Sequence, residues 1–177
     1  MEVLKDFEDI FEVDERWKFF GRGDASNLKE LHTEVKNIEL IPEVPEDVVS
    51  QFNVAKMLAV YAWGYFPLHQ VAELKAFSTL EMALRIKLAP NKRTTFKALL
   101  DKAVENGYIT DDIFSAFPSL GNIKGYSAKL PSLLSSMRND LAHGDTSLNH
   151  GSVFTLRHCA TIMNSLFNSH LINKKTE

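Results

Sequence analysis

Hydrophobic residues recur along most of the chain with the period of an α-helix. The clearest pattern begins at Glu46, where apolar residues at intervals of three or four predict a helix over about 46–66. Pro67 suits the first turn of a second helix, which the pattern predicts to run to about Leu88. The apolar positions of the first helix are Val48, Phe52, Ala55, Ala59, Trp63 and Phe66.

The second half of the chain shows two more long helical patterns. One covers about 126–143, where Pro131 is expected to start or kink the regular part, and the other covers about 151–171. A shorter helix, which Thr94 or Thr95 is expected to cap and which ends near Glu105, precedes them, as does a short helix near 111–117. The inward-facing apolar residues of the two long helices are Leu130, Leu133, Leu134, Met137 and Leu141, and Val153, Leu156, Ala160, Met163 and Phe167.

No stretch alternates convincingly between apolar and polar residues, so no β-strand is predicted and the fold class is all-α. The four long helices are expected to form a four-helix up-and-down bundle, with the shorter helices inserted between its second and third members. Pro42 and Pro45 mark a boundary before the bundle. We therefore divide the chain into an acidic N-terminal extension, residues 1–45, and a helical bundle domain, residues 46–177.

Composition narrows the class of protein further. The 177 residues are enough for one domain with a hydrophobic core, and the proportions of 45% hydrophobic and 24% charged residues are ordinary. Because Cys159 is the only cysteine, an internal disulfide and a cysteine-based zinc site within one chain are excluded. No apolar run approaches the roughly 20 residues of a membrane span, and the first residues lack a signal-peptide pattern. We expect a cytoplasmic protein without a membrane partner.

Charge is unevenly distributed along the chain. Residues 1–50 carry 14 acidic and 6 basic side chains, a net charge of −8, whereas residues 51–177 carry 9 acidic and 14 basic ones, a net charge of +5. A mildly basic body is compatible with a polyanionic partner such as nucleic acid. The acidic leading segment could then fold over a binding cleft as an internal mimic of that polyanion.

One stretch, Met137-Arg138-Asn139-Asp140-Leu141-Ala142-His143-Gly144, combines residue types that carry chemistry. It is expected at the end of a helix, with Gly144 at the C-cap. On an ideal helix Arg138 and His143 point about 140° apart, whereas Asn139 and His143 share one edge, so the amide is expected to orient the imidazole. Arg138 and His143 converge on one atom only if the helix end relaxes or a second copy of the chain supplies the missing partner.

These residue types suit phosphodiester chemistry. A histidine exchanges a proton near neutral pH, and an arginine holds a phosphate and stabilises the charge that develops on it. No metal is needed when the 2′-hydroxyl of RNA is the nucleophile, and the sequence shows no metal-binding spacing, so no cofactor is expected. A structural role competes with this interpretation, because basic and polar residues at a helix C-terminus also interact favourably with the helix dipole.

A carboxylate also falls within the apolar stripe of the second predicted helix. Glu81 would cost on the order of several kcal/mol there unless it were paired or hydrogen-bonded. Arg85, four residues later, can pair with it locally, and an arginine from another helix can do so as well. The apolar residues of the stripe are Leu74, Phe77, Leu84 and Leu88.

The order Arg138-Asn139-x-x-x-His143 resembles the R-x4-6-H signature of the HEPN superfamily, the higher eukaryotes and prokaryotes nucleotide-binding domains. The likeness extends to Pro45-Glu46-Asp47-Val48 at the start of a helix, to a Tyr65-Phe66 end, and to a second helix that carries Leu80-Glu81-Met82-Ala83-Leu84-Arg85. It covers about residues 46–171 and leaves the first 45 residues unexplained.

The resemblance implies a metal-independent endoribonuclease, as a toxin or a defence effector, with His143 as the acid and base and Arg138 as the phosphate clamp. It implies that Asn139 has an orienting role and that Glu81, beside Arg85, pairs with an arginine of the site and holds it in position. It also implies a homodimer in which two copies of the motif line one cleft, and a separately encoded antitoxin or regulator. The alternative is a non-catalytic helical dimer that binds RNA or a protein partner.

Other residues extend the candidate surface. Lys129 and Arg157 are candidate RNA-binding residues, although solvated helix faces commonly carry such charges. His150 and His158 are candidates for a second proton-transfer group, and the competing expectation is that both are surface histidines.

Overall fold

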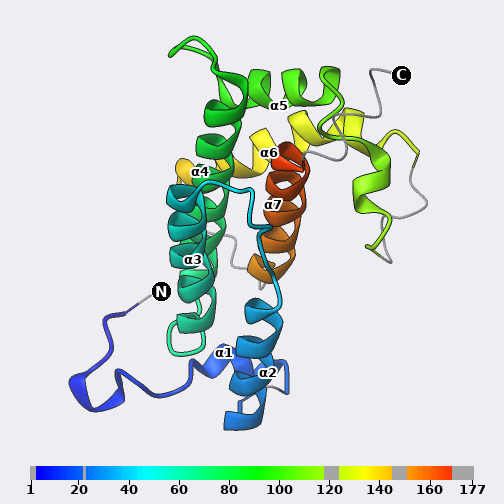
Figure 1. Cartoon of the computed structure of the whole chain (residues 1–177). Coiled ribbons are helices and arrows are strands. Elements are labelled where there is room, and N and C mark those ends of the chain that lie inside the picture. Colours follow the sequence, from blue (N-terminus) through cyan, green and yellow to red (C-terminus); the bar gives the residue numbers. More distant parts are fainter. Residues whose placement is uncertain (1–2, 22, 118–123, 145–150, 169–177) are drawn as a thin grey trace.

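The computed structural model describes residues 3–21, 23–117, 124–144 and 151–168. Every regular element in these ranges is a helix, which confirms the predicted all-α class (Figure 1). In the described part of the chain, no helix is both long and apolar enough to cross a membrane.

Four long helices correspond to the four predicted ones. They are α3 (Glu46–Tyr61), α4 (Leu68–Leu88), α6 (Tyr126–Ala142) and α7 (Ser152–Phe167). α3 ends before the predicted position because its last turn tightens: the N–H groups of Trp63 and Gly64 donate to carbonyl oxygens three residues back, at 3.1 and 3.0 Å. Residues 169–171 of the last predicted helix lie outside the described residues.

Shorter elements connect the long helices. α5 (Phe96–Glu105) begins where the side chain of Thr95 accepts a hydrogen bond from Ala98 N–H at 3.2 Å. The 3₁₀ turn η2 (Asp111–Phe114) follows. The Asp111 carboxylate accepts from the N–H groups of Gly125 and Ser127 at 2.6 and 2.8 Å and thereby holds the start of α6. α6 then continues through Pro131, which lies inside the helix rather than at its start.

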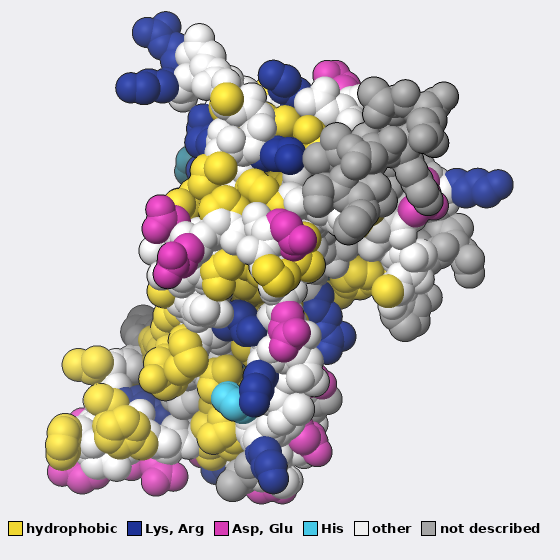
Figure 2. All heavy atoms as spheres, viewed as in Figure 1, with side chains coloured by type: hydrophobic (Ala, Val, Ile, Leu, Met, Phe, Trp, Pro, Cys, Tyr) yellow, Lys and Arg dark blue, Asp and Glu magenta, His cyan; other side chains and the backbone are white. Residues whose placement is uncertain are grey.

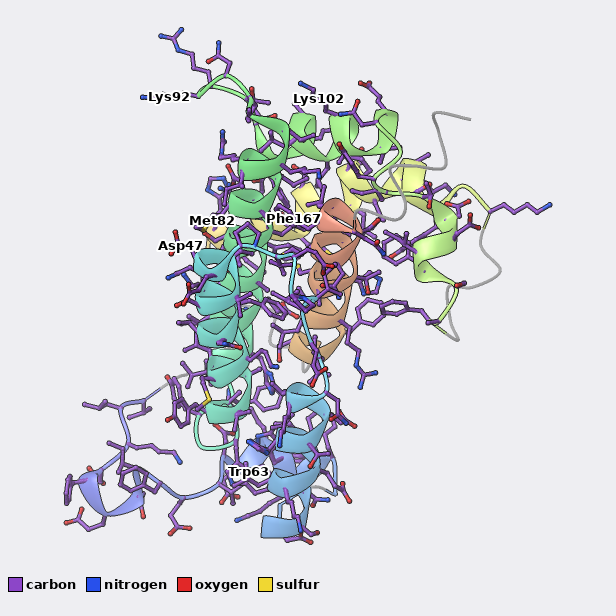
Figure 3. The ribbon with its side chains drawn as sticks, viewed as in Figure 1. Asp47, Trp63, Met82, Lys92, Lys102 and Phe167 are labelled. Carbon is purple, nitrogen blue, oxygen red and sulfur yellow. The ribbon has the colours of Figure 1, made fainter. Side chains whose placement is uncertain are left out.

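α4 is the central helix of the molecule. It packs against α3, α5, α6 and α7, and small side chains such as Ala72, Ala76 and Ala83 are fully buried where its neighbours approach. α3 lies antiparallel beside it, since Asp47 near the start of α3 and Met82 late in α4 line one hollow (Figure 3). α5 lies across one end of α4, and α6 passes behind α4 and packs on both (Figure 1).

The N-terminal segment shares the hydrophobic core of the long helices from Asp14 onward. It contains a 3₁₀ turn, η1 (Phe7–Asp9), and two helices, α1 (Glu15–Phe19) and α2 (Ala25–Lys36). Trp17 Nε1 donates to Ala62 O at 3.0 Å, and its ring centroid lies 5.7 Å from that of Trp63, at the end of the molecule where Figure 3 labels it. Leu31 and Val35 of α2 belong to the same hydrophobic core.

Asp14 fixes this segment to the turn between α3 and α4. Its carboxylate accepts hydrogen bonds from Phe66 N–H at 2.9 Å and from Arg16 Nε at 2.8 Å, and its own N–H donates to Trp63 O. Burial alone would raise the pKa of Asp14, but the hydrogen bonds from Arg16 and Phe66 outweigh it and lower the pKa. Removing residues 1–45 would therefore strip part of the core as well as the acidic charge.

Candidate functional site

Glu81 on α4 joins two arginines from different parts of the chain. Its Oε1 accepts from Arg85 Nη2 at 2.7 Å and from Arg85 Nε at 3.2 Å, and Arg85 Nη2 also donates to Thr94 O at 2.8 Å. Its Oε2 lies 3.5 Å from Nη2 of Arg138 on α6. Both kinds of partner expected for Glu81 are therefore present. Because these side chains are partly exposed, each pair contributes about 1 kcal/mol or less, and the pairs chiefly orient the guanidinium of Arg138.

Arg138 also uses Asn139, the residue that follows it. Its Nη1 donates to Asn139 Oδ1 at 3.3 Å. The amide oxygen of Asn139 therefore accepts from a charged guanidinium, which is a stronger donor than a neutral imidazole. The orienting role predicted for Asn139 toward His143 stays a prediction. The Arg138 side chain is 38% exposed, so its remaining N–H groups are accessible to a phosphate.

His143 forms the C-cap of α6 and is exposed. Its backbone N–H still donates to Asn139 O at 2.9 Å, the regular helical bond, and the left-handed turn begins only at Gly144, with φ +82°. His143 itself departs from helical dihedral angles, with φ −91° and ψ 7°. On an ideal helix its side chain would point about 140° away from that of Arg138. Within one copy, Arg138 turns toward Glu81 on α4 while His143 is exposed, and no hydrogen bond among the described residues joins the two side chains.

The apolar face predicted for α6 is only partly buried. Leu130 and Leu134 lie in the core, as expected. Leu133 is 45% exposed, and Met137 and Leu141 are only half-buried, which corrects the expectation that all five residues face inward. The physical reason is that α6 packs chiefly on α5 and α4, so that Met137 and Leu141 lie only partly against the core and Leu133 lies outside it.

Lys129 and Arg157 are exposed, but they do not join Arg138. Lys129 precedes Arg138 by nine residues on α6, which is roughly 13 Å along a helix axis. Arg157 lies on α7 in a hollow that α7 and α2 line, and the same hollow carries Glu34 and Glu39. Those carboxylates disfavour a phosphate beside Arg157. The structure therefore gives neither residue a place next to the Arg138 guanidinium.

His158 is buried, so the expectation of a surface histidine is wrong for this residue. Its Nδ1 donates to Phe154 O at 3.0 Å, and its Nε2 accepts from the hydroxyl of Tyr126 at 3.1 Å. Its ring stacks on Phe114, with centroids 5.6 Å apart. Burial lowers the pKa of His158, which makes it a neutral link between α6 and α7. His150 lies outside the described residues.

A second carboxylate on α4 is more deeply buried than Glu81. Glu73 is 3% exposed and accepts one hydrogen bond, from Thr155 Oγ1 at 3.1 Å. Burial raises the pKa of Glu73 to about 7. Burial also raises the pKa of the neighbouring Cys159 thiol, and the carboxylate of Glu73 raises it further. The carboxyl group of Glu73 is therefore partly protonated near neutral pH.

Glu73 belongs to a row of polar side chains between α4 and α7 that was not foreseen. One turn earlier, Nδ1 of the buried His69 lies 2.7 Å from Ser152 Oγ. The sequence does hold a signal for this row, because His69, Glu73, Ala76 and Leu80 follow the helical period. Among the described residues, no three His, Cys, Asp or Glu side chains are grouped so that they could hold a metal ion.

Comparisons of the chain with protein-family models, with curated proteins and with solved structures gave no match. The HEPN resemblance therefore has no support from a related protein and depends on the sequence motifs of this chain alone. The structural features that bear on it are Arg138 and His143 near the end of one helix and the Glu81 carboxylate on a second.

Proposed function

We propose that the chain is a HEPN-type endoribonuclease that cleaves RNA without a metal ion. The observation that supports it best is the Arg138 guanidinium, which Glu81 holds from α4 while its other N–H groups stay accessible. The exposed imidazole of His143 lies five residues later on the same helix. In this proposal α3, α4, α6 and α7 are the four members of a HEPN-like bundle, and residues 1–45 are its extension.

The chemistry follows from the two side chains. The imidazole of His143 removes the proton from an RNA 2′-hydroxyl, whose oxygen attacks the adjacent phosphorus. The bond from phosphorus to the 5′-oxygen of the next nucleotide breaks, and that oxygen takes the proton back from the imidazolium. Arg138 binds the non-bridging oxygens and stabilises their developing charge. The products are a 2′,3′-cyclic phosphate and a 5′-hydroxyl.

The divergence of Arg138 and His143 supports a homodimer as the active form. Two copies related by a twofold axis place Arg138 of one copy opposite His143 of the other, and the same symmetry forms this site twice. The apolar row Leu133, Met137 and Leu141 on α6 gives such a dimer a surface to bury. RNA is the substrate in this proposal. A toxin or defence role with a protein antitoxin or regulator belongs to it through the family resemblance.

RNA cleavage in the presence of EDTA tests the mechanism. Wild type is expected to cut RNA, and His143→Ala is expected to lose at least about a hundredfold in rate, as for removal of a general acid and base. His32→Ala is the matched control, because His32 is an exposed histidine on α2. An oligonucleotide with 2′-deoxyribose at the cut site should resist cleavage. Activity that survives His143→Ala, or that disappears with the chelator, would contradict the proposal.

A non-catalytic RNA-binding dimer is the second candidate. The observation that favours it is that Arg138 is already engaged by Glu81 and Asn139 and does not meet His143 within one copy. This candidate predicts that wild type cuts no RNA in the cleavage assay. It also predicts that wild type binds RNA and that Arg138→Ala weakens this binding.

A further inference from the structure

Exposed apolar groups gather at the N-terminal side of the molecule. Residues 3–12, here called the N-terminal arm, precede Asp14, and the first part of the arm projects away from the helices (Figure 1). The backbone oxygens of Ile10 and Glu12 lie beside Gly64 in the turn between α3 and α4. Phe7 and Phe11 of the arm are 82% and 91% exposed, and Figure 2 shows hydrophobic side chains crowded at this corner. Contiguous exposed apolar groups of this kind mark an interaction surface.

The arm is also acidic. Asp6, Glu8, Asp9 and Glu12 form no ion pair with any described residue. Lys5, whose Nζ donates to the backbone oxygens of Asp9 and Glu12 at 3.4 and 2.7 Å, offsets only one of these four negative charges. A binding site for the arm must therefore offer an apolar pocket bordered by positive charge.

The chain itself carries a pocket of that chemistry between α2 and α3. Its volume is about 180 Å³, and its lining includes the apolar side chains of Val35, Met57 and Val60. An apolar cavity of about 150 Å³ accommodates benzene, so this pocket has room for one phenylalanine ring. Met57 and Val60 lie in the last turns of α3, close to the turn at which Asp14 holds the base of the arm.

Two lysines, Lys36 and Lys56, border this pocket, and the carboxylate of Glu39 lies near Lys56. Lys56 donates from Nζ to Lys36 O and Ile38 O, at 3.2 and 2.7 Å, which fixes one ammonium group at the edge. Lys36 also lines the pocket, and its ammonium group forms no ion pair with a described residue. Lys29, seven residues before Lys36, lies on the same exposed face of α2.

We propose that two copies of this chain exchange their N-terminal arms. A phenylalanine of each arm enters the pocket between α2 and α3 of the other copy, and the arm carboxylates face Lys29 and Lys36. The exchange is reciprocal, so it closes as a symmetric dimer and leaves no arm unpaired. It uses none of the α6 residues of the proposed ribonuclease site, and it stands or falls independently of that function.

Disulfide trapping between two separately tagged chains tests the exchange. One chain carries Glu8→Cys, between the two arm phenylalanines, and the other carries Asn53→Cys, at the pocket. The natural Cys159 is fully buried and does not compete. Ile86→Cys is the matched control partner, because Ile86 is 47% exposed on α4. The mixed disulfide should form at least about tenfold faster with Asn53→Cys than with Ile86→Cys.

Further substitutions separate the arm from other causes of association. Phe7→Ser combined with Phe11→Ser should abolish the faster disulfide formation with Asn53→Cys. Phe19→Ser, at an equally exposed phenylalanine outside the arm, should leave that faster rate unchanged. Equal rates with the two partner chains would overturn the exchange. A faster rate with Asn53→Cys that persists without both arm phenylalanines would also overturn it. So would a chain with both Glu8→Cys and Asn53→Cys that forms its disulfide only within itself. RNA cleavage is not measured, so the ribonuclease proposal can fail without affecting these outcomes.

Discussion

Replacing Glu73 by glutamine is expected to stabilise the protein at pH 8 and to change its stability little near pH 4. Burial raises the pKa of Glu73 from its ordinary value of 4.5 to about 7, so the folded protein binds this proton more tightly than the unfolded chain does. The contribution of Glu73 to the free energy of unfolding is therefore greatest below about pH 4.5. It declines as the pH rises to about 7 and stays low above that.

The size of the effect follows from the same pKa difference. Each tenfold change in proton binding corresponds to about 1.4 kcal/mol, so the interval from 4.5 to about 7 corresponds to roughly 3 kcal/mol. Above pH 7 the wild type bears this cost, because an ionised carboxylate is almost fully buried with one hydrogen bond, from Thr155. The thiol of Cys159 beside it supplies no positive charge. Glutamine has nearly the same shape, accepts the same hydrogen bond and is neutral at every pH.

Urea denaturation of wild type and Glu73→Gln between pH 4 and pH 8.5 measures the difference directly. The stabilisation by glutamine should grow from near zero to about 3 kcal/mol as the pH rises. Glu105→Gln, at an exposed glutamate on α5, is the control and should show no such trend. A difference that is constant with pH, or that grows toward acid, would refute the reasoning.

Three further predictions concern the base of the N-terminal segment and the ion pair between Glu81 and Arg138. Trp17→Ala should lower the free energy of unfolding by about 3–5 kcal/mol in urea, because the indole is buried and donates to Ala62 O. Asp14→Asn should remove stability that is present above pH 3.8 and lost as the pH falls through the lowered pKa of Asp14, as acid denaturation of both proteins would show. Glu81→Gln should leave the melting temperature nearly unchanged and weaken RNA cleavage about tenfold, because Arg138 loses its charged support.

Much of the helical layout could be predicted because amphipathic periodicity is a local property of the chain. The start of α5 at Thr95 and the length of α4 follow from capping and apolar spacing alone. The partners of Glu81 were foreseeable in kind, since a carboxylate in an apolar stripe needs compensation. Which arginine would reach it from another helix, here Arg138, depends on how α6 crosses α4.

Tertiary packing decided what could not be predicted. α4 is covered by four helices, so the apolar stripe through Glu81 does not reveal that Glu73, on another side, is the more deeply buried acid. His158 can be buried because Tyr126 and Phe154 satisfy its ring nitrogens. Tyr126 lies 32 residues away in the sequence, so no local pattern predicts this hydrogen bond. Trp17 belongs to the core although its helix has only five residues, too few for a periodic pattern.

The central claim is that Arg138 and His143 from two copies form one ribonuclease site, and mixing two inactive variants tests it most directly. Arg138→Ala leaves Glu81 paired with Arg85, and His143→Ala changes only an exposed side chain, so both variants should fold. Equal amounts that pair at random give mixed dimers in half of the cases. Each mixed dimer holds one intact site of two, so about a quarter of the wild-type activity should return in EDTA. A mixture that stays as inactive as either variant alone would contradict the shared site, and variants that each cleave RNA alone would contradict the catalytic assignment.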